Sequence, residues 1–146
     1  VKWVTEIEIL RDEEEGFWSE WEGTSSVNTV AKLWQANPTD GGMEVAGHAY
    51  AGPRGIESVE VSTDGGQTWS RAELSEPLPS PAAWRQWRYE WSPDGESAEV
   101  VVRAIDGEGR LQPEAYSEPK PDGATGWVSR RVDTTEATDF TRGYRR

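Results

Sequence analysis

The sequence predicts an all-β sandwich of about seven strands. Short runs rich in β-branched and aromatic residues recur at regular spacing, and each is bounded by turn-forming residues. No segment between them has the three-to-four-residue periodicity of an amphipathic helix, and a chain of 146 residues has the size of one domain. The predicted strands cover residues 43–51, 56–62, 68–74, 84–91, 98–105 and 127–133.

Two features support these strands: side chains that alternate between apolar and polar within a run, and turn-forming residues that separate the runs. Residues 84–91 place one set of side chains on one face and a second set on the other, as in a half-buried strand. The apolar set is Trp87, Tyr89 and Trp91, and the polar set is Gln86, Arg88 and Glu90. The separators are Gly52-Pro53, Asp64-Gly65-Gly66, the proline-rich stretch 76–81, Pro93-Asp94-Gly95 and residues 107–109. No internal repeat indicates a propeller.

The two ends of the chain differ from this pattern. Residues 1–10 alternate as an N-terminal strand, residues 11–23 form an acidic loop with aromatic residues, and residues 24–42 are a polar connection. We therefore expect one domain over residues 1–133, with a lead-in strand and loop over 1–42 and the sandwich proper over 43–133. Residues 134–146 form a polar tail whose last part we expect to be mobile.

The net charge of −12 argues against two classes of partner. Acidic residues number 27 against 15 basic ones, so the surface repels both phosphate backbones and anionic lipid. We expect no nucleic-acid partner and no membrane partner. No apolar run is long enough to cross a bilayer, and we expect a soluble chain without a signal peptide. The localisation stays open, although the dispersed acidic residues suggest a high-salt organism.

The residue inventory leaves little for catalysis. The chain has no cysteine and a single histidine, His48, which excludes thiolate metal sites and multi-histidine centres. His48 lacks a plausible serine or second histidine beside it, so we expect it to project from a strand or to make an ordinary hydrogen bond. Acidic pairs such as Asp106 and Glu108 are common in so acidic a chain, and this pair suits a turn. We predict no catalytic residues, no metal ligands and no cofactor in this chain alone.

Nine tryptophans are the most prominent feature, and three interpretations stay open. They can belong to the core, to an association surface or to a platform for stacking sugars. Tryptophan and arginine concentrate at interface hot spots, and they interleave in one predicted strand. The candidate interface residues are Trp84, Arg85, Trp87 and Arg88.

Residues 62–69, Ser-Thr-Asp-Gly-Gly-Gln-Thr-Trp, predict a hairpin loop. Its glycines allow positive φ, Asp64 can accept backbone N–H bonds across the turn, and Trp69 can fold back over the loop. The segment resembles the Asp-box of sialidases, which is itself a structural hairpin. Sialidases carry several copies on propeller blades, so the single copy here argues against a sialidase.

Several segments together resemble the C-terminal dimerisation domain of the sulfite oxidase family of molybdenum-cofactor oxidoreductases, over residues 1–132. The most specific is the stretch through the Asp-box-like hairpin. The matching segments are, in chain order, Val1-Lys2-Trp3-Val4, residues 45–52, residues 54–56, residues 59–69, Ala83-Trp84-Arg85-Gln86-Trp87 and residues 102–113.

The resemblance implies an immunoglobulin-like (E-set) sandwich that forms a homodimer and supports an N-terminal molybdenum domain. The molybdenum–molybdopterin cofactor would belong to the parent enzyme, with Val1 and Lys2 contributing to the pterin pocket. The family's Asn-Ala-Trp-His-Arg run has no match in residues 122–132, so sulfite and other oxyanions both remain possible substrates of the parent. The alternative function is a carbohydrate-binding module that uses its tryptophans for stacking.

Overall fold

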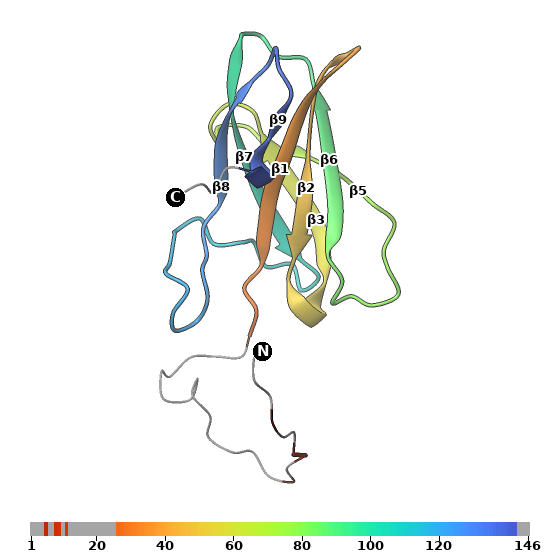
Figure 1. Ribbon diagram of the computed structural model, residues 1–146, viewed down its shortest axis with the longest axis vertical. Helices are drawn as coiled ribbons and strands as arrows, with labels where there is room; N and C mark the ends of the chain where they lie inside the picture. The colour runs from red at the N-terminus through yellow and green to blue at the C-terminus, as the bar shows by residue number, and fades with distance from the viewer. Residues whose placement is uncertain (1–4, 6–7, 10, 12–25, 143–146) are drawn as a thin grey trace.

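The computed structural model describes residues 5, 8–9, 11 and 26–142, and it shows a sandwich of two antiparallel sheets (Figure 1). The five-stranded sheet has the order β5-β6-β2-β1-β9, and the four-stranded sheet has the order β4-β3-β7-β8. The predicted all-β fold is confirmed. The strands are β1 (Val30–Thr39), β2 (Gly42–Tyr50), β3 (Ile56–Ser62), β4 (Ser70–Arg71), β5 (Glu73–Leu74), β6 (Arg85–Trp91), β7 (Ser97–Asp106), β8 (Val128–Asp133) and β9 (Thr138–Asp139), with 3-10 turns η2 (Gly52–Arg54) and η3 (Phe140–Arg142).

The sandwich begins at Val30, and the expected start at Met43 is wrong. Residues Val30–Thr39 form β1, which pairs with β2 as an antiparallel hairpin closed by Asp40 and Gly41. A bulge hides this strand in the sequence, because the register shifts between Leu33 and Gln35 and the extra residue breaks the alternation. Of the connection that we expected over 24–42, the described residues 26–29 lie outside the strands.

Strands β3 and β6 agree with the prediction. β3 has the predicted bounds, and β6 begins one residue later than predicted. The predicted faces of β6 are confirmed, since Trp87 is buried and Tyr89 and Trp91 pack against the core, while Gln86, Arg88 and Glu90 are exposed. Alternation flanked by turn residues is therefore a reliable signal in these two strands.

The single strand predicted over residues 68–74 is instead two short strands in different sheets. β4 pairs with β3, and β5 pairs with β6. Between them lies the buried Ala72, whose N–H donates to the carbonyl of Val59 at 2.8 Å. The chain therefore crosses from one sheet to the other at this residue.

The C-terminal segment also takes part in the fold. β9 pairs with β1 through Gln35 and Ala36, and Phe140 packs against the core. The expectation of a mere polar tail over 134–146 is therefore wrong for Thr138–Phe140. Residues 143–146 lie outside the described residues, as do Val1, Lys2 and most of the predicted N-terminal strand.

Asp106 ties the end of β7 to two other segments. Its Oδ2 accepts from Arg54 Nε at 2.7 Å and from Thr29 Oγ1 at 3.2 Å, while Arg54 Nη2 donates to the carbonyl of Val27 at 2.8 Å. The other oxygen accepts from the backbone N–H groups of Glu108 and Arg110. Burial raises the pKa of Asp106, but these hydrogen bonds outweigh burial and lower it to about 2. Asp106 thus holds a turn, as predicted, and also anchors the segment that enters β1.

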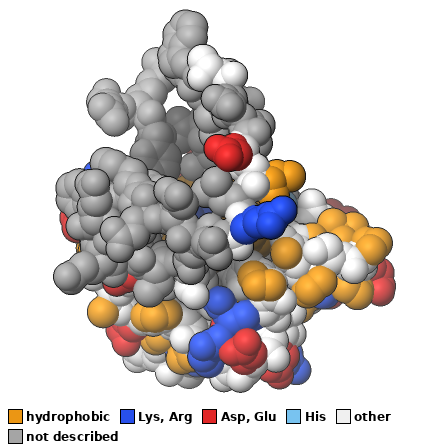
Figure 2. All heavy atoms as spheres, turned by 90° about the horizontal axis from the view of Figure 1, so that it is seen from below, with side chains coloured by type: hydrophobic (Ala, Val, Ile, Leu, Met, Phe, Trp, Pro, Cys, Tyr) orange, Lys and Arg blue, Asp and Glu red, His pale blue; other side chains and the backbone are white. Residues whose placement is uncertain are grey.

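The loop between β5 and β6 projects to the side of the sandwich, near the end shown at the bottom of Figure 1. Seen from that end, hydrophobic side chains gather on the side of this loop (Figure 2). The loop contains Leu78, whose residue is 60% exposed, and it ends at Trp84 beside β6. This apolar margin borders the outer face of the five-stranded sheet.

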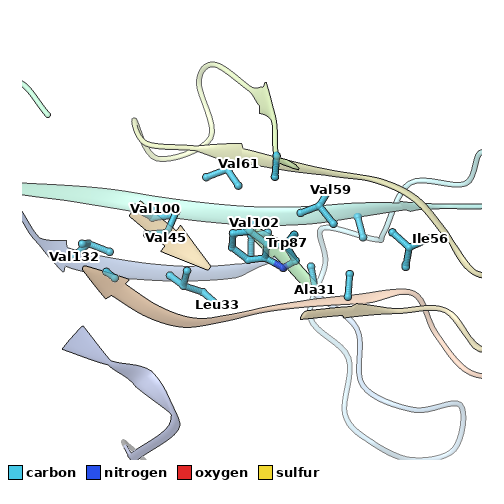
Figure 3. Packing of buried hydrophobic residues seen from close by; sticks show 14 of the residues in the cluster. Ala31, Leu33, Val45, Ile56, Val59, Val61, Trp87, Val100, Val102 and Val132 are labelled. Carbon is cyan, nitrogen blue, oxygen red and sulfur yellow. The ribbon is translucent and has the colours of Figure 1, made fainter. Parts of the chain in front are cut away.

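The core lies between the two sheets and is built mostly of valine and alanine with one tryptophan (Figure 3). Trp87, which is 2% exposed, packs over Gly47 of β2. A Cβ at position 47 would lie 2.8 Å from Cζ2 of Trp87 and would overlap the carbonyl oxygen of Lys32. Glycine is therefore required there by space.

Candidate association surface

The outer face of the four-stranded sheet is covered by its own side chains. The guanidinium carbon of Arg103 lies 3.8 Å from the centre of the Trp69 ring and 5.0 Å from that of Trp127. Arg103 Nε also donates to Glu60 at 2.7 Å. On the same face, Val101 points outward yet is only 6% exposed. This face has little apolar surface left for a partner.

The Asp-box-like hairpin holds part of that cover. Asp64 accepts from the hydroxyls of Ser62 and Thr68 and from the backbone N–H groups of Gln67 and Thr68. The Ser62 hydrogen bond, followed by those from Thr68 and Gln67, holds the Asp64 pKa well below its ordinary value. Trp69 Nε1 donates to the carbonyl of Gly66 at 3.1 Å, so the tryptophan folds back as predicted. The hairpin therefore has a structural role.

The outer face of the five-stranded sheet is open and aromatic. Alternate residues of β2 point inward and are buried, so Glu44, Ala46, His48 and Tyr50 point outward. His48 and Tyr50 form an aromatic row with two exposed tryptophans, Trp34 and Trp84, which are 41% and 47% exposed. The Trp34 and His48 rings lie 4.0 Å apart, Tyr50 stacks on Trp84 at 4.9 Å, and His48 meets Trp84 edge-on at 6.3 Å.

A groove of about 450 Å³ runs along this face beside the aromatic row. Its lining includes Trp34, His48, Glu44, Glu73 and Arg88. Arg88 pairs with Glu73 at 2.9 Å and reaches Glu44 at 3.9 Å, which neutralises much of the local charge. The Nδ1 atom of His48 is buried and has no hydrogen-bond partner among the described residues, and burial lowers the pKa of His48.

The four predicted interface residues divide between the two faces of β6. Trp84 and Arg88 lie on the open face beside the groove. Trp87 lies in the core, and Arg85 shares its parity and donates Nη2 to the carbonyl of Ser75 at 2.6 Å, which fixes the β5–β6 loop. As surface candidates Trp87 is therefore wrong and Arg85 is poorly placed.

The sequence reasoning missed Trp34, His48 and Tyr50 as members of one surface. The alternation that would have marked Trp34 as a strand residue is broken by the bulge in β1. The aromatic row also forms only when β1 and β6 lie on either side of β2. No group of three or more potential metal ligands occurs among residues 26–142 or the other described positions. In the same part of the chain, no helix has the length and apolarity needed to span a membrane.

The fold and this surface define a class of module, a β-sandwich whose two outer faces differ, one covered by its own side chains and the other lined by exposed aromatic rings. A family model for the Mo-co oxidoreductase dimerisation domain matches residues 24–119. The chain belongs to this family of dimerisation domains, as the resemblance implied. The description of the family places such dimerisation domains in Mo-co oxidoreductases.

Relatives of known function are sulfite oxidases. The chain is 35% identical over 83 residues to the mitochondrial sulfite oxidase of Mus musculus, covering 53% of this chain and 15% of that protein. It is 25% identical over 149 aligned positions to the sulfite oxidase of Arabidopsis thaliana, covering 78% of this chain and 37% of that protein. The chain therefore spans well under half the length of either relative.

A solved structure confirms the fold. The sulfane dehydrogenase SoxCD from Paracoccus pantotrophus superimposes with a TM-score of 0.53 at 20% sequence identity, covering 77% of this chain and 31% of that one. The predicted immunoglobulin-like sandwich is thereby confirmed. The family assignment also favours association over the carbohydrate-binding alternative.

Proposed function

We propose that this chain pairs two copies of its parent protein through the open face of the five-stranded sheet. The observation that carries the proposal is the contrast between the two sheets, since one outer face is covered by Arg103 and its tryptophans while the other exposes Trp34 and Trp84. Aromatic side chains beside an arginine are typical anchors of protein interfaces. Trp84 and Arg88 of the predicted set contribute to this surface, whereas Trp87 supports it from within.

Sedimentation equilibrium of the 146-residue chain tests this proposal. We expect a species of twice the 16.3 kDa monomer mass at micromolar concentration, with reversible dissociation on dilution. The measurement is repeated at low and high salt, because the net charge of −12 opposes association more strongly at low salt. A monomer at every concentration and salt level would contradict the proposal for this chain.

The parent's chemistry is a separate proposal that rests on the relatives. We propose that the parent oxidises sulfite or acts on another oxyanion, with its molybdenum bound outside this chain, which contains no thiolate donor. Lys2, as a point charge suited to a phosphate, and Val1 would border the pterin, although both lie outside the described residues. Metal analysis of the purified parent, combined with oxyanion-dependent reduction of an artificial electron acceptor, tests the proposal. A Lys2→Ala parent is expected to hold less molybdopterin.

The acidic surface supports a further proposal about the working environment. We propose that the protein functions at high salt, where screening reduces repulsion among its 27 acidic residues. The urea midpoint is expected to rise between low and molar potassium chloride. A midpoint independent of salt would contradict this proposal and leave the association proposal unaffected.

A further inference from the structure

The geometry points to a particular dimer, in which two open faces pack against each other and Trp34 of each copy lies over Arg88 of the other. This inference rests on the proposed function, because it requires that the chain self-associates. It adds the occupant of the groove, the orientation of the two copies and a specific anchor that the sequence reasoning missed.

The bulge in β1 changes which side chains reach the surface but leaves the buried side chains of the strand in place. Leu33 and Ala36 are buried on either side of it, so the core stripe of β1 continues across the interruption. The inserted position turns both Trp34 and Gln35 to the outside. Bulges re-aim side chains in this way at functional edges and sites. The large apolar ring of Trp34 is thus exposed to solvent. Covering it with a partner would be favourable, because burial removes apolar surface from water.

The positions of Trp34 and Arg88 make the face self-complementary. β1 and β6 flank β2 on opposite sides. Arg88 pairs in register with Ala46, and Trp34 lies at the bulge opposite Gly47 and Ala46, so both residues lie at the same level along β2. A twofold axis running along β2 exchanges these two positions between copies. Each tryptophan then covers a guanidinium of the partner copy, which forms two cation–π contacts.

The same axis avoids clashes of charge on the flanking strands. Glu90 and Asn37 are both in register with Glu44, so each Glu90 faces the partner's Asn37. Lys32 and Gln86 are both in register with His48 and face each other likewise. At the centre of the face lies Ala46, whose small side chain permits close approach. Glu44, near the axis, lies 3.9 Å from its own Arg88, which also pairs with Glu73 at 2.9 Å.

Edge-to-edge pairing is a poorer route for a second copy. β8 is an edge strand of the four-stranded sheet, and it exposes Arg130 and Arg131, which form no ion pair with the described residues. Antiparallel pairing of two β8 strands about a twofold axis would bring these arginines together. Charged residues on edge strands commonly prevent such pairing. The second copy is therefore expected to dock on a face and not on this edge.

Sedimentation of matched variants of the full 146-residue chain tests the inference. Ala46→Arg adds a long cation at the centre of the open face and is expected to abolish the dimer. Ser129→Arg adds the same side chain to the other sheet, where Ser129 lies beside Glu99, and is expected to leave the dimer intact. Trp34→Ala and Arg88→Ala are each expected to raise the dissociation constant about tenfold or more. Circular dichroism and urea unfolding report whether each variant folds.

A double-mutant cycle tests the specific contact. If Trp34 lies on the partner's Arg88, the double variant loses less affinity than the product of the two single losses. Multiplicative losses would overturn the Trp34–Arg88 contact. A dimer that survives Ala46→Arg would overturn the choice of face.

Hydroxyl-radical footprinting of the wild-type chain gives an answer even if a variant fails to fold. Oxidation of Trp34 and Trp84 is expected to fall several-fold when the concentration is raised through the dissociation constant. Leu111, which is exposed but lies outside the open face, is expected to remain equally reactive. Equal reactivity of both tryptophans in monomer and dimer would overturn the inference and the choice of the open face, while self-association of the chain would stand. Multiplicative losses in the double-mutant cycle, with both tryptophans protected, would overturn the Trp34–Arg88 contact alone and leave the proposed function intact. A chain that never dimerises would instead contradict the proposed function.

Discussion

Arg103 and Trp69 form the tightest cation–π contact among the described residues, with 3.8 Å between the guanidinium carbon and the ring centre. Because Trp69 also donates to the carbonyl of Gly66, the ring is fixed at both its face and its nitrogen. Glu60 holds the other side of Arg103. The chain itself thus covers this face of the sandwich, and the proposed association surface lies on the other sheet.

Removing Trp69 is therefore expected to affect stability without affecting association. Trp69→Ala removes the cation–π contact with Arg103 and the edge-on contact with Trp127, and we expect a loss of about 2 kcal/mol in the free energy of unfolding. Urea unfolding measures this loss, and sedimentation of the folded variant is expected to show an unchanged dissociation constant. A weakened dimer with normal stability would place the association surface on the wrong sheet.

The sequence predicts most strands but not the surface, for physical reasons that particular residues show. β3 and β6 are predictable because turn residues bound an alternating pattern. β1 is hidden by the bulge at Trp34, and the change of sheet at Ala72 leaves the local pattern unchanged. The row of Trp34, His48 and Trp84 depends on β1 and β6 both pairing with β2, and such non-local pairing leaves no trace in the spacing of one strand.

Asp106 predicts a specific acid sensitivity. Its pKa falls from 3.8 to about 2 on folding, so its contribution is fully present above pH 3.8 and is lost as the pH falls to about 2. The difference corresponds to about 2 kcal/mol. Asp106→Asn is expected to be about 3 kcal/mol less stable at neutral pH, because Arg54 loses its buried partner, and to lack this part of the acid dependence. Unfolding curves between pH 2 and 7 for both proteins test this, and parallel pH profiles would contradict it.

His48 predicts a second pH dependence, in a different range. Burial lowers its pKa below 6.5, so the unfolded chain takes up a proton at a higher pH than the folded chain does. The contribution of His48 to the free energy of unfolding is therefore fully present above pH 6.5, and it decreases as the pH drops below that value. Because it is the only histidine in the sequence, NMR titration of one imidazole measures the shift directly. His48→Gln is expected to abolish the fall in this range, and a measured pKa at or above 6.5 would contradict the prediction.

The packing around Gly47 leaves no room for a side chain at this position of the five-stranded sheet. In Gly47→Ala the added methyl group would overlap the carbonyl oxygen of Lys32 and press on Trp87, so β1 or the tryptophan must shift. We expect a loss of about 3 kcal/mol or more in the free energy of unfolding, with a change in near-ultraviolet circular dichroism from the displaced indole. Gly41→Ala, where a methyl group meets nothing within 4 Å, is the control and is expected to cost far less. Equal losses in the two variants would contradict the packing argument.

The crossing of the chain at Ala72 has a mechanical consequence. One residue joins β4 in one sheet to β5 in the other, and it is itself bonded to Val59. A force that slides one sheet past the other would therefore load this short tether at once, before the loops at the ends of the sandwich become taut. In an assembly whose copies pull on one sheet alone, such a tether transmits the force to the other sheet, so that the two sheets move together.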